Sequence, residues 1–173
     1  MSKAVMLSIR PKWVEKIARG EKTIEVRKTR PKLDTSFRCY IYCTLPKYPH
    51  EDFIATDYPM PQFYGGGKVI GEFTCDRIYE LAPLNHAPDD VEKQACMTRE
   101  EIVNYLKGTG YGWHISDLRI YDQPREFTEF RQSCPNDLYC EDCAMYSNNN
   151  GICNNGALPL RRPPQSWCYV EED

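Results

Sequence analysis

The sequence predicts an α+β fold in which about five or six β-strands combine with two helices. Apolar and polar residues alternate with period two in several short segments, as they do in half-buried strands. Only two segments have helical spacing, so strands and helices do not alternate as a parallel α/β sheet requires. The chain has 173 residues, a usual length for one domain, and we expect residues 1–173 to form a single domain.

The first expected element is a short helix over residues 8–20. Pro11 suits the first helical turn, where its missing N–H costs no hydrogen bond, and Gly20 is typical of a C-terminal stop. Trp13 and Ile17 are one turn apart and predict a side of the helix that faces the core.

Strands are predicted wherever the alternation is clear. They cover residues 22–28, 38–44, 68–79 and 111–121, and a short final strand follows Pro163. In the segment 38–44 one face carries Cys, Ile and Cys and the other carries two tyrosines. A strand that is apolar on both faces is covered on both sides of its sheet.

The second helix is expected to begin at Thr98. Thr98 and Glu101 have the spacing of a capping box, in which each side chain accepts a hydrogen bond from the other residue's backbone N–H. Ile102, Tyr105 and Leu106 follow at helical spacing and predict its buried stripe.

Two segments do not fit either pattern. Residues 45–67 are rich in Pro, Tyr and Gly and predict a long loop, and residues 131–158 predict a cysteine-rich insert. No apolar run is long enough to cross a membrane, and the first residues lack the apolar stretch of a secretory signal. We therefore expect a cytoplasmic protein, whose nine cysteines stay reduced and whose clustered cysteines bind metal rather than form disulfides.

The insert contains the metal-site candidates. It is rich in Asn, Gly and Asp and has almost nothing apolar to bury, so a metal would supply its order. The expected ligands of one structural Zn²⁺ are Cys134, Cys140, Cys143 and Cys153. An iron–sulfur cluster uses the same ligands, and a flexible loop with reduced cysteines is the third possibility. The remaining five cysteines are expected to act as small hydrophobic residues, although Cys168 could replace one of the four ligands.

Positive charge is concentrated at the start of the chain. The formal net charge is only −3, which excludes a polycation, but residues 1–38 hold half of the 22 lysines and arginines and four of the 25 acidic residues. Such a distribution predicts a local anion-binding face on an acidic body. A solvated helix and loop would explain the same charges without any ligand.

Several segments resemble the ASCH domain in the expected order. The first match is the opening Leu7-Ser8-Ile9-Arg10-Pro11, followed by the strand motif of residues 20–28. Later matches are Lys68–Phe73, Trp113–Ser116 and Pro164–Trp167, so the resemblance spans nearly the whole chain apart from the long loop and the insert. It implies a PUA-like mixed β-barrel with peripheral helices. It also implies a cleft along the Lys22–Arg27 strand that binds RNA or a nucleotide.

The residues expected to face nucleic acid combine cations, polar groups and an aromatic ring. They are Arg10, Lys12, Lys22, Thr23, Arg27, Lys28, Trp113, His114, Gln165 and Ser166. The cations would contact phosphates, while Gln165 and Ser166 could read a base edge. Trp113 could stack a base, although a core position is the commoner role of a strand tryptophan, and His114 could be a general base or a simple hydrogen-bond partner.

The resemblance also implies an enzymatic alternative. Some relatives are hydrolases, one branch acting on the acetyl amide of N4-acetylcytidine and another member cleaving RNA. Here Lys22 and Glu25 are the catalytic candidates, a lysine of lowered pKa beside a proton acceptor. The amidohydrolase branch has Thr at the position of Glu25. By strict alternation Lys22 and Glu25 face opposite sides, so their joint action requires an irregular start to the strand.

Two further interpretations remain open. Glu25 and Arg27 could form no more than a surface ion pair beside a barrel strand. The domain could also be a protein-interaction module, as in transcriptional coactivators that carry it, with the cysteine-rich insert as its docking surface.

Overall fold

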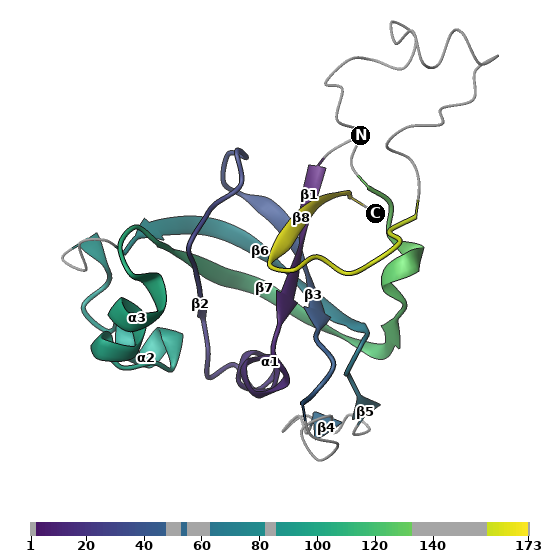
Figure 1. Ribbon diagram of the computed structural model, residues 1–173, viewed down its shortest axis with the longest axis horizontal. Coiled ribbons are helices and arrows are strands. Elements are labelled where there is room, and N and C mark those ends of the chain that lie inside the picture. Colours follow the sequence, from purple (N-terminus) through teal and green to yellow (C-terminus); the bar gives the residue numbers. More distant parts are fainter. Residues whose placement is uncertain (1–2, 48–52, 55–62, 82–85, 133–158, 173) are drawn as a thin grey trace, which may run out of the picture.

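The computed structural model describes residues 3–47, 53–54, 63–81, 86–132 and 159–172, which form a strongly curved, six-stranded mixed sheet with a few short helices (Figure 1). The strands are β1 (Lys3–Ile9), β2 (Ile24–Arg27), β3 (Phe37–Cys43), β6 (Val69–Glu80), β7 (Tyr111–Arg125) and β8 (Trp167–Glu171). The helices are α1 (Pro11–Ala18), α2 (Val91–Ala95) and α3 (Arg99–Leu106), with a 3₁₀ turn at Phe127–Glu129. The α+β prediction is confirmed.

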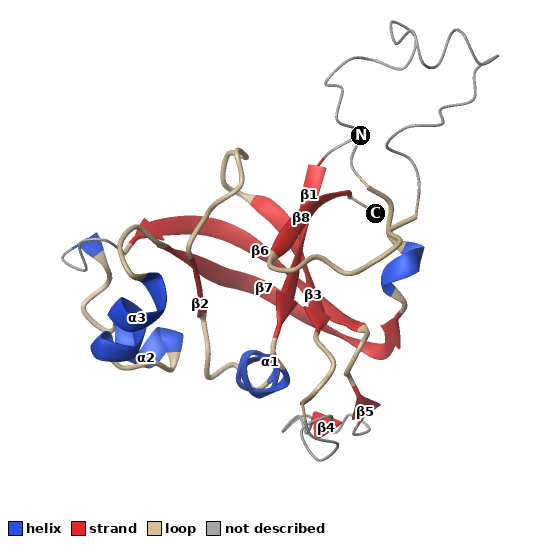
Figure 2. Cartoon of the chain, in the orientation of Figure 1, coloured by secondary structure: helices blue, strands red, loops and turns tan. Residues whose placement is uncertain are grey.

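The sheet has the strand order β2-β7-β6-β3-β1-β8. β1 runs parallel to β3, and all other neighbours are antiparallel. β2 and β8 are thus the two edges, and the sheet forms a half-barrel. Figure 2 shows α1, α2 and α3 gathered on one side of this curved sheet, with α2 and α3 close together.

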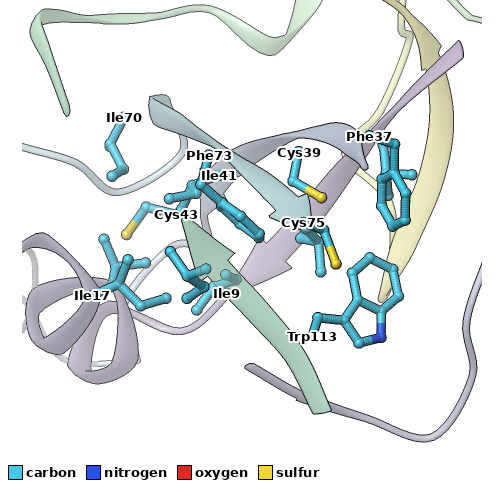
Figure 3. Packing of buried hydrophobic residues seen from close by; sticks show 14 residues of the cluster. Ile9, Ile17, Phe37, Cys39, Ile41, Cys43, Ile70, Phe73, Cys75 and Trp113 are labelled. Atoms are coloured by element: carbon cyan, nitrogen blue, oxygen red, sulfur yellow. The ribbon is translucent and has the colours of Figure 1, made fainter. Parts of the chain in front are cut away.

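The inner face of the half-barrel holds the largest core cluster (Figure 3). Cys39, Ile41 and Cys43 of β3 point into it, together with Trp113 of β7. Tyr40 and its neighbour Tyr42 point to the opposite face, where Tyr40 packs on Phe130 with ring centroids 4.8 Å apart. The prediction that this strand is covered on both sides is confirmed, and Cys39, Cys43 and Cys75 are fully buried small residues.

A third cluster fixes α3 to the edge strand β2. Ile102 and Leu106 of α3 pack with Ile24 and Val26 of β2. The predicted capping box is present: the backbone N–H of Glu101 donates to the Thr98 hydroxyl at 3.1 Å, and the Thr98 N–H donates to the Glu101 carboxylate at 2.8 Å.

The expected elements differ from the structure at the N-terminus and in β6. The chain is a strand as far as Ile9, and the helix begins only at Pro11. β1 was not predicted because it is buried on both faces and shows no alternation. In β6 strict alternation would place Val69 and Phe73 on one face, but a register shift between Val69 and Gly71 puts them in different clusters. A Cβ on Gly71 would lie 2.4 Å from the Arg119 carbonyl oxygen, so only glycine fits there.

The segment 45–67, predicted as a loop, contains a two-stranded ladder of β4 (Phe53–Ile54) and β5 (Phe63–Tyr64). Residues 133–158 lie outside the described part of the chain, and so do the four predicted zinc ligands. The flanks of this segment are paired, since the Leu160 N–H donates to the Phe130 carbonyl at 2.8 Å. In the part of the chain that the structure describes, no helix is long and apolar enough to span a membrane.

Candidate functional site

A cleft of about 610 Å³ lies where the end of β1, α1, β2 and α3 meet, with the segment before β8 as a further wall. Seven of the sequence-predicted site residues line it: Arg10, Lys12, Lys22, Glu25, Arg27, Gln165 and Ser166. Thr23, Lys28, Trp113 and His114 lie elsewhere. Residues near both ends of the chain therefore contribute polar groups to the cleft.

Lys22 reaches the cleft from a turn rather than from a regular strand. Gly20 has a φ of +73°, which favours glycine, and the N–H groups of Glu21 and Lys22 both donate to the Lys16 carbonyl. β2 begins only at Ile24. The strand therefore has the irregular start that brings Lys22 to the same side as Glu25.

The floor of the cleft is a buried charge triad of Lys22, Glu25 and Arg27, exposed by only 2%, 6% and 6%. One Glu25 carboxylate oxygen lies 3.0 Å from Arg27 Nη2, and the other lies 3.5 Å from Lys22 Nζ. Lys22 also donates to the Ala95 carbonyl at 2.7 Å. The Glu25–Arg27 pair exists but is not the surface pair that was one of the interpretations, because both side chains are buried.

Burial lowers the pKa of Lys22 below its usual value of 10.5, because an ammonium loses its water shell there. The negative charge of Glu25 raises this pKa, and Arg27 lowers it slightly, but desolvation dominates. The amine of Lys22 is therefore easier to deprotonate than that of a surface lysine.

Arg27 joins the two edges of the half-barrel. Its Nη2 donates to the Ser8 carbonyl at 2.8 Å, and its Nη1 contacts the carbonyl and hydroxyl oxygens of Ser166 at 3.2 and 3.3 Å. Trp167 reinforces this junction, since its indole N–H donates to the Thr29 hydroxyl at 2.9 Å. The seam between β2 and the β1–β8 edge is therefore held by side chains where a closed barrel would use backbone pairing.

Arg10 and Lys12 are exposed cations that line the cleft, and Lys28 is an exposed cation beside the lining residue Tyr105; we call these three the rim cations. The Lys12 ammonium lies 4.4 Å from the centroid of the Trp13 ring. The Lys28 ammonium lies 5.5 Å from the centroid of the Tyr105 ring, although Lys28 itself does not line the cleft. The rim cations are open to solvent, unlike the cations of the floor.

The structure adds lining residues that the sequence did not indicate. They include Ser8, Trp13, Met97, Glu101, Asn104 and Tyr105. Trp13 and Tyr105 were expected in the core, yet Trp13 is half-buried and Tyr105 is 43% exposed. The sequence contained one signal that an apolar side chain of α3 would be exposed. The helix has apolar residues at both 102–103 and 105–106, more than one buried stripe can hold.

Three further sequence-predicted residues, Trp113, His114 and Thr23, do not line the cleft. Trp113 is fully buried against Phe37, so it cannot stack a base, and the core alternative is the one the structure shows. Its indole N–H has no hydrogen-bond partner among the described residues. His114 lies on the opposite face of β7, where its Nδ1 is 2.6 Å from an Asp76 carboxylate oxygen. Thr23, the residue after Lys22, contacts the Gln94 amide oxygen at 3.3 Å.

Within the described ranges no three His, Cys, Asp or Glu side chains cluster in a way that could hold a metal ion. The four cysteines predicted to bind zinc lie outside those ranges. The zinc site therefore stays a prediction.

Comparisons with known proteins agree with the fold. The ASCH domain family model matches residues 7–47, which include α1, β2 and β3. Among solved structures, the crystal structure of ASCH from Zymomonas mobilis is similar, with a TM-score of 0.58, 16% identity, and coverage of 98% of this chain and 88% of that chain. Crystal structures of two single-substitution mutants of that protein, ZmASCH, give the same TM-score and identity. No curated protein matches the chain.

Proposed function

We propose that this chain, which is an ASCH-domain protein with a PUA-like fold, uses its basic cleft to bind RNA or a nucleotide. One observation carries the proposal: four separate elements bring cations and uncharged polar groups to the same cleft. Its volume of about 610 Å³ falls in the usual range of small-ligand sites, roughly 300–1,000 Å³.

The exposed cations and the exposed amide of the cleft suit the phosphate and the base of a nucleotide. Arg10 and Lys12 are exposed and able to approach phosphate oxygens, the usual targets of Arg and Lys in nucleic-acid complexes. Gln165 is exposed and offers an amide that can both donate and accept hydrogen bonds. The charges and polar groups therefore support a ligand with both a phosphate and a base.

The test is fluorescence anisotropy of short labelled RNA and DNA single strands over a series of salt concentrations. We expect salt-dependent binding that Lys12→Ala weakens, with the slope of log K against log salt reduced by about one. Lys93→Ala is the matched control, because Lys93 is an exposed helical lysine outside the cleft. Absence of binding by the unchanged protein at low salt would refute nucleic-acid binding and leave only nucleotide-sized ligands.

A second function, hydrolysis of a modified nucleoside or of RNA, has its own supporting observation. Lys22 is buried, has a lowered pKa and lies 3.5 Å from Glu25. In amide hydrolysis a neutral Lys22 amine would take the proton of an attacking water as the new C–O bond forms. The resulting ammonium would protonate the leaving nitrogen as the C–N bond breaks, which restores the neutral amine.

The hydrolase proposal is tested by incubating the protein with N4-acetylcytidine and, separately, with single-stranded RNA. Release of cytidine and acetate, or of RNA fragments, that is lost in Lys22→Met would support it. Unchanged substrates at protein concentrations that bind them would leave the cleft a binding site only.

A further inference from the structure

An exposed aromatic ring lines the cleft without a role in the core. Among the described residues only three large hydrophobic side chains are exposed: Leu45, Val103 and Tyr105. Of these, Tyr105 alone lines the cleft. The Tyr105 ring is 43% exposed and lines the cleft, so a ligand in the cleft can reach it.

The ring is presented by a rigid element. Ile102 and Leu106, on the adjoining side of α3, are exposed by 0% and 5% and pack on β2, the strand that carries Glu25 and Arg27. The capping box fixes the first turn of the same helix. The ring is therefore held at a defined place relative to the charge triad, as a recognition surface must be.

The buried charges of the cleft floor already have partners, so the cleft interior suits an uncharged group. Each oxygen of Glu25 faces one cation of the floor, and the Arg27 guanidinium also donates to Ser8 and Ser166. The rim cations, unlike those of the floor, are open to solvent, and the Lys28 ammonium lies over one face of the Tyr105 ring, 5.5 Å from its centroid. A nucleotide has the matching layout, with a flat uncharged base and a phosphate a few bonds away.

We propose that Tyr105 stacks an unpaired nucleobase of a single-stranded nucleic acid, with Lys28 taking the adjoining phosphate and Asn104 the edge of the base. Asn104 lines the cleft, and its side chain makes no hydrogen bond within the part of the chain that the structure describes. The ligand is single-stranded because the faces of paired bases are covered by their neighbours, whereas a free base can lie on an aromatic ring. This inference rests on the proposed function and assigns its ligand class.

The experiment uses the full chain and a labelled single-stranded RNA hexamer that carries 2-aminopurine. Binding should quench the 2-aminopurine fluorescence, because the base stacks on the ring. Tyr105→Leu should weaken binding roughly 5- to 150-fold and abolish the quenching, while Tyr105→Phe, which keeps the ring, should retain both. Val103→Ala is the matched control, since Val103 is exposed on the same helix but does not line the cleft. A duplex of the same sequence should compete poorly.

The outcomes separate this inference from the proposed function. If Tyr105→Leu binds the hexamer as the unchanged protein does while Lys12→Ala weakens it, the stacking role is refuted and the basic cleft stands. If the duplex competes as well as the single strand, the ligand class is refuted. If the unchanged protein binds no RNA or DNA, nucleic-acid binding as the proposed function falls and this inference with it. Circular dichroism and thermal unfolding of each variant establish that a loss of binding is not a loss of fold.

Discussion

Lys22 is a cleft residue whose protonation depends on the fold. Burial lowers its pKa in the folded state below the ordinary value of 10.5, which applies to the unfolded chain. At a pH between these two pKa values the unfolded chain therefore binds more protons than the folded chain. Stability due to this group therefore increases as the pH rises through that window, is complete above 10.5, and is lost as the pH falls through the folded pKa.

The variant Lys22→Met isolates this contribution, because methionine keeps an unbranched apolar stem and cannot titrate. We expect the stability of the unchanged protein relative to Lys22→Met to increase as the pH rises from the lowered pKa of the folded state toward 10.5. Urea unfolding at a series of pH values measures it. A difference that stays constant with pH would show that Lys22 has the same pKa in both states.

Arg27 contributes more to the stability of the fold than its position on a short edge strand indicates. Arg27→Ala leaves Glu25 with one cation instead of two and removes the donors to Ser8 and Ser166. We expect a loss of about 3–5 kcal/mol in the free energy of unfolding, typical when one partner of a buried ion pair is deleted. Arg27→Lys should recover only part of it, since an ammonium lacks the planar fork of donors.

Urea unfolding measures the Arg27 effect, with Lys28→Ala as its control. Lys28 is exposed and only one residue away, so its replacement should change the stability by less than about 0.5 kcal/mol. Equal effects of the two substitutions would contradict a seam held by Arg27.

Sequence patterns identified the polar residues of the site but could not show which of them meet. Lys22, Glu25 and Arg27 were selected from their residue types and spacing, and from a resemblance. Their contact depends on the turn at Gly20, which shifts Lys22 out of the strand alternation. For Tyr105 the sequence indicated only that α3 has more apolar residues than one buried stripe can hold. Which of them is left exposed depends on the packing of α3 on β2, where Ile102 and Leu106 are covered.

Among the elements, those with one solvated face were the predictable ones. β7 shows alternation near its start, with Trp113 and Ile115 in the core, as expected. β1 gave no such signal, because Ala4 and Met6 enter one cluster while Val5 and Leu7 enter the other. α2 has only five residues, too few for a helical period to be recognised.

The N-terminal cap of α3 is the local feature that most directly supports the cleft wall. Thr98→Ala removes the acceptor for the Glu101 N–H, and we expect it to cost about 1 kcal/mol of stability. Thermal or urea unfolding measures the loss. Thr109→Ala is the control, because Thr109 is exposed and follows the helix. A Thr98 variant as stable as the control would mean that packing on β2 alone fixes the helix.

At the scale of the whole molecule, the described residues on the two sides of the segment 133–158 pair with each other. Arg131 and Pro159 form a β-bridge, and the Phe130 carbonyl accepts from the Leu160 N–H at 2.8 Å. The half-barrel is therefore joined across the base of the segment. The prediction that the segment binds structural zinc can be tested separately from the fold.

We expect purified protein to contain one zinc per chain, measured by elemental analysis. Replacement of residues 133–158 by a short Gly-Ser linker should remove the zinc and leave thermal unfolding of the half-barrel nearly unchanged, because the junction is retained. Cys96→Ser, outside the segment, should keep the metal. Zinc retained by the shortened chain would place its ligands elsewhere, and unfolding of the shortened chain would show that the segment supports the sheet.

Because β1 pairs with β8, the sheet can be completed only after β8 has been synthesised. The Ser8 hydroxyl donates to the Pro164 carbonyl, a partner 156 positions later, and β1 pairs with β8 from Lys3 to Leu7. At about 5–20 residues per second the ribosome delivers that partner roughly 8 to 30 seconds after the first strand. Throughout this interval the nascent chain carries an apolar strand with one open edge, and the cleft lacks the wall that Gln165 and Ser166 supply. The cleft therefore has all of its walls only after the segment before β8 has been made, and a chain stalled before this segment has neither a paired β1 edge nor a complete cleft.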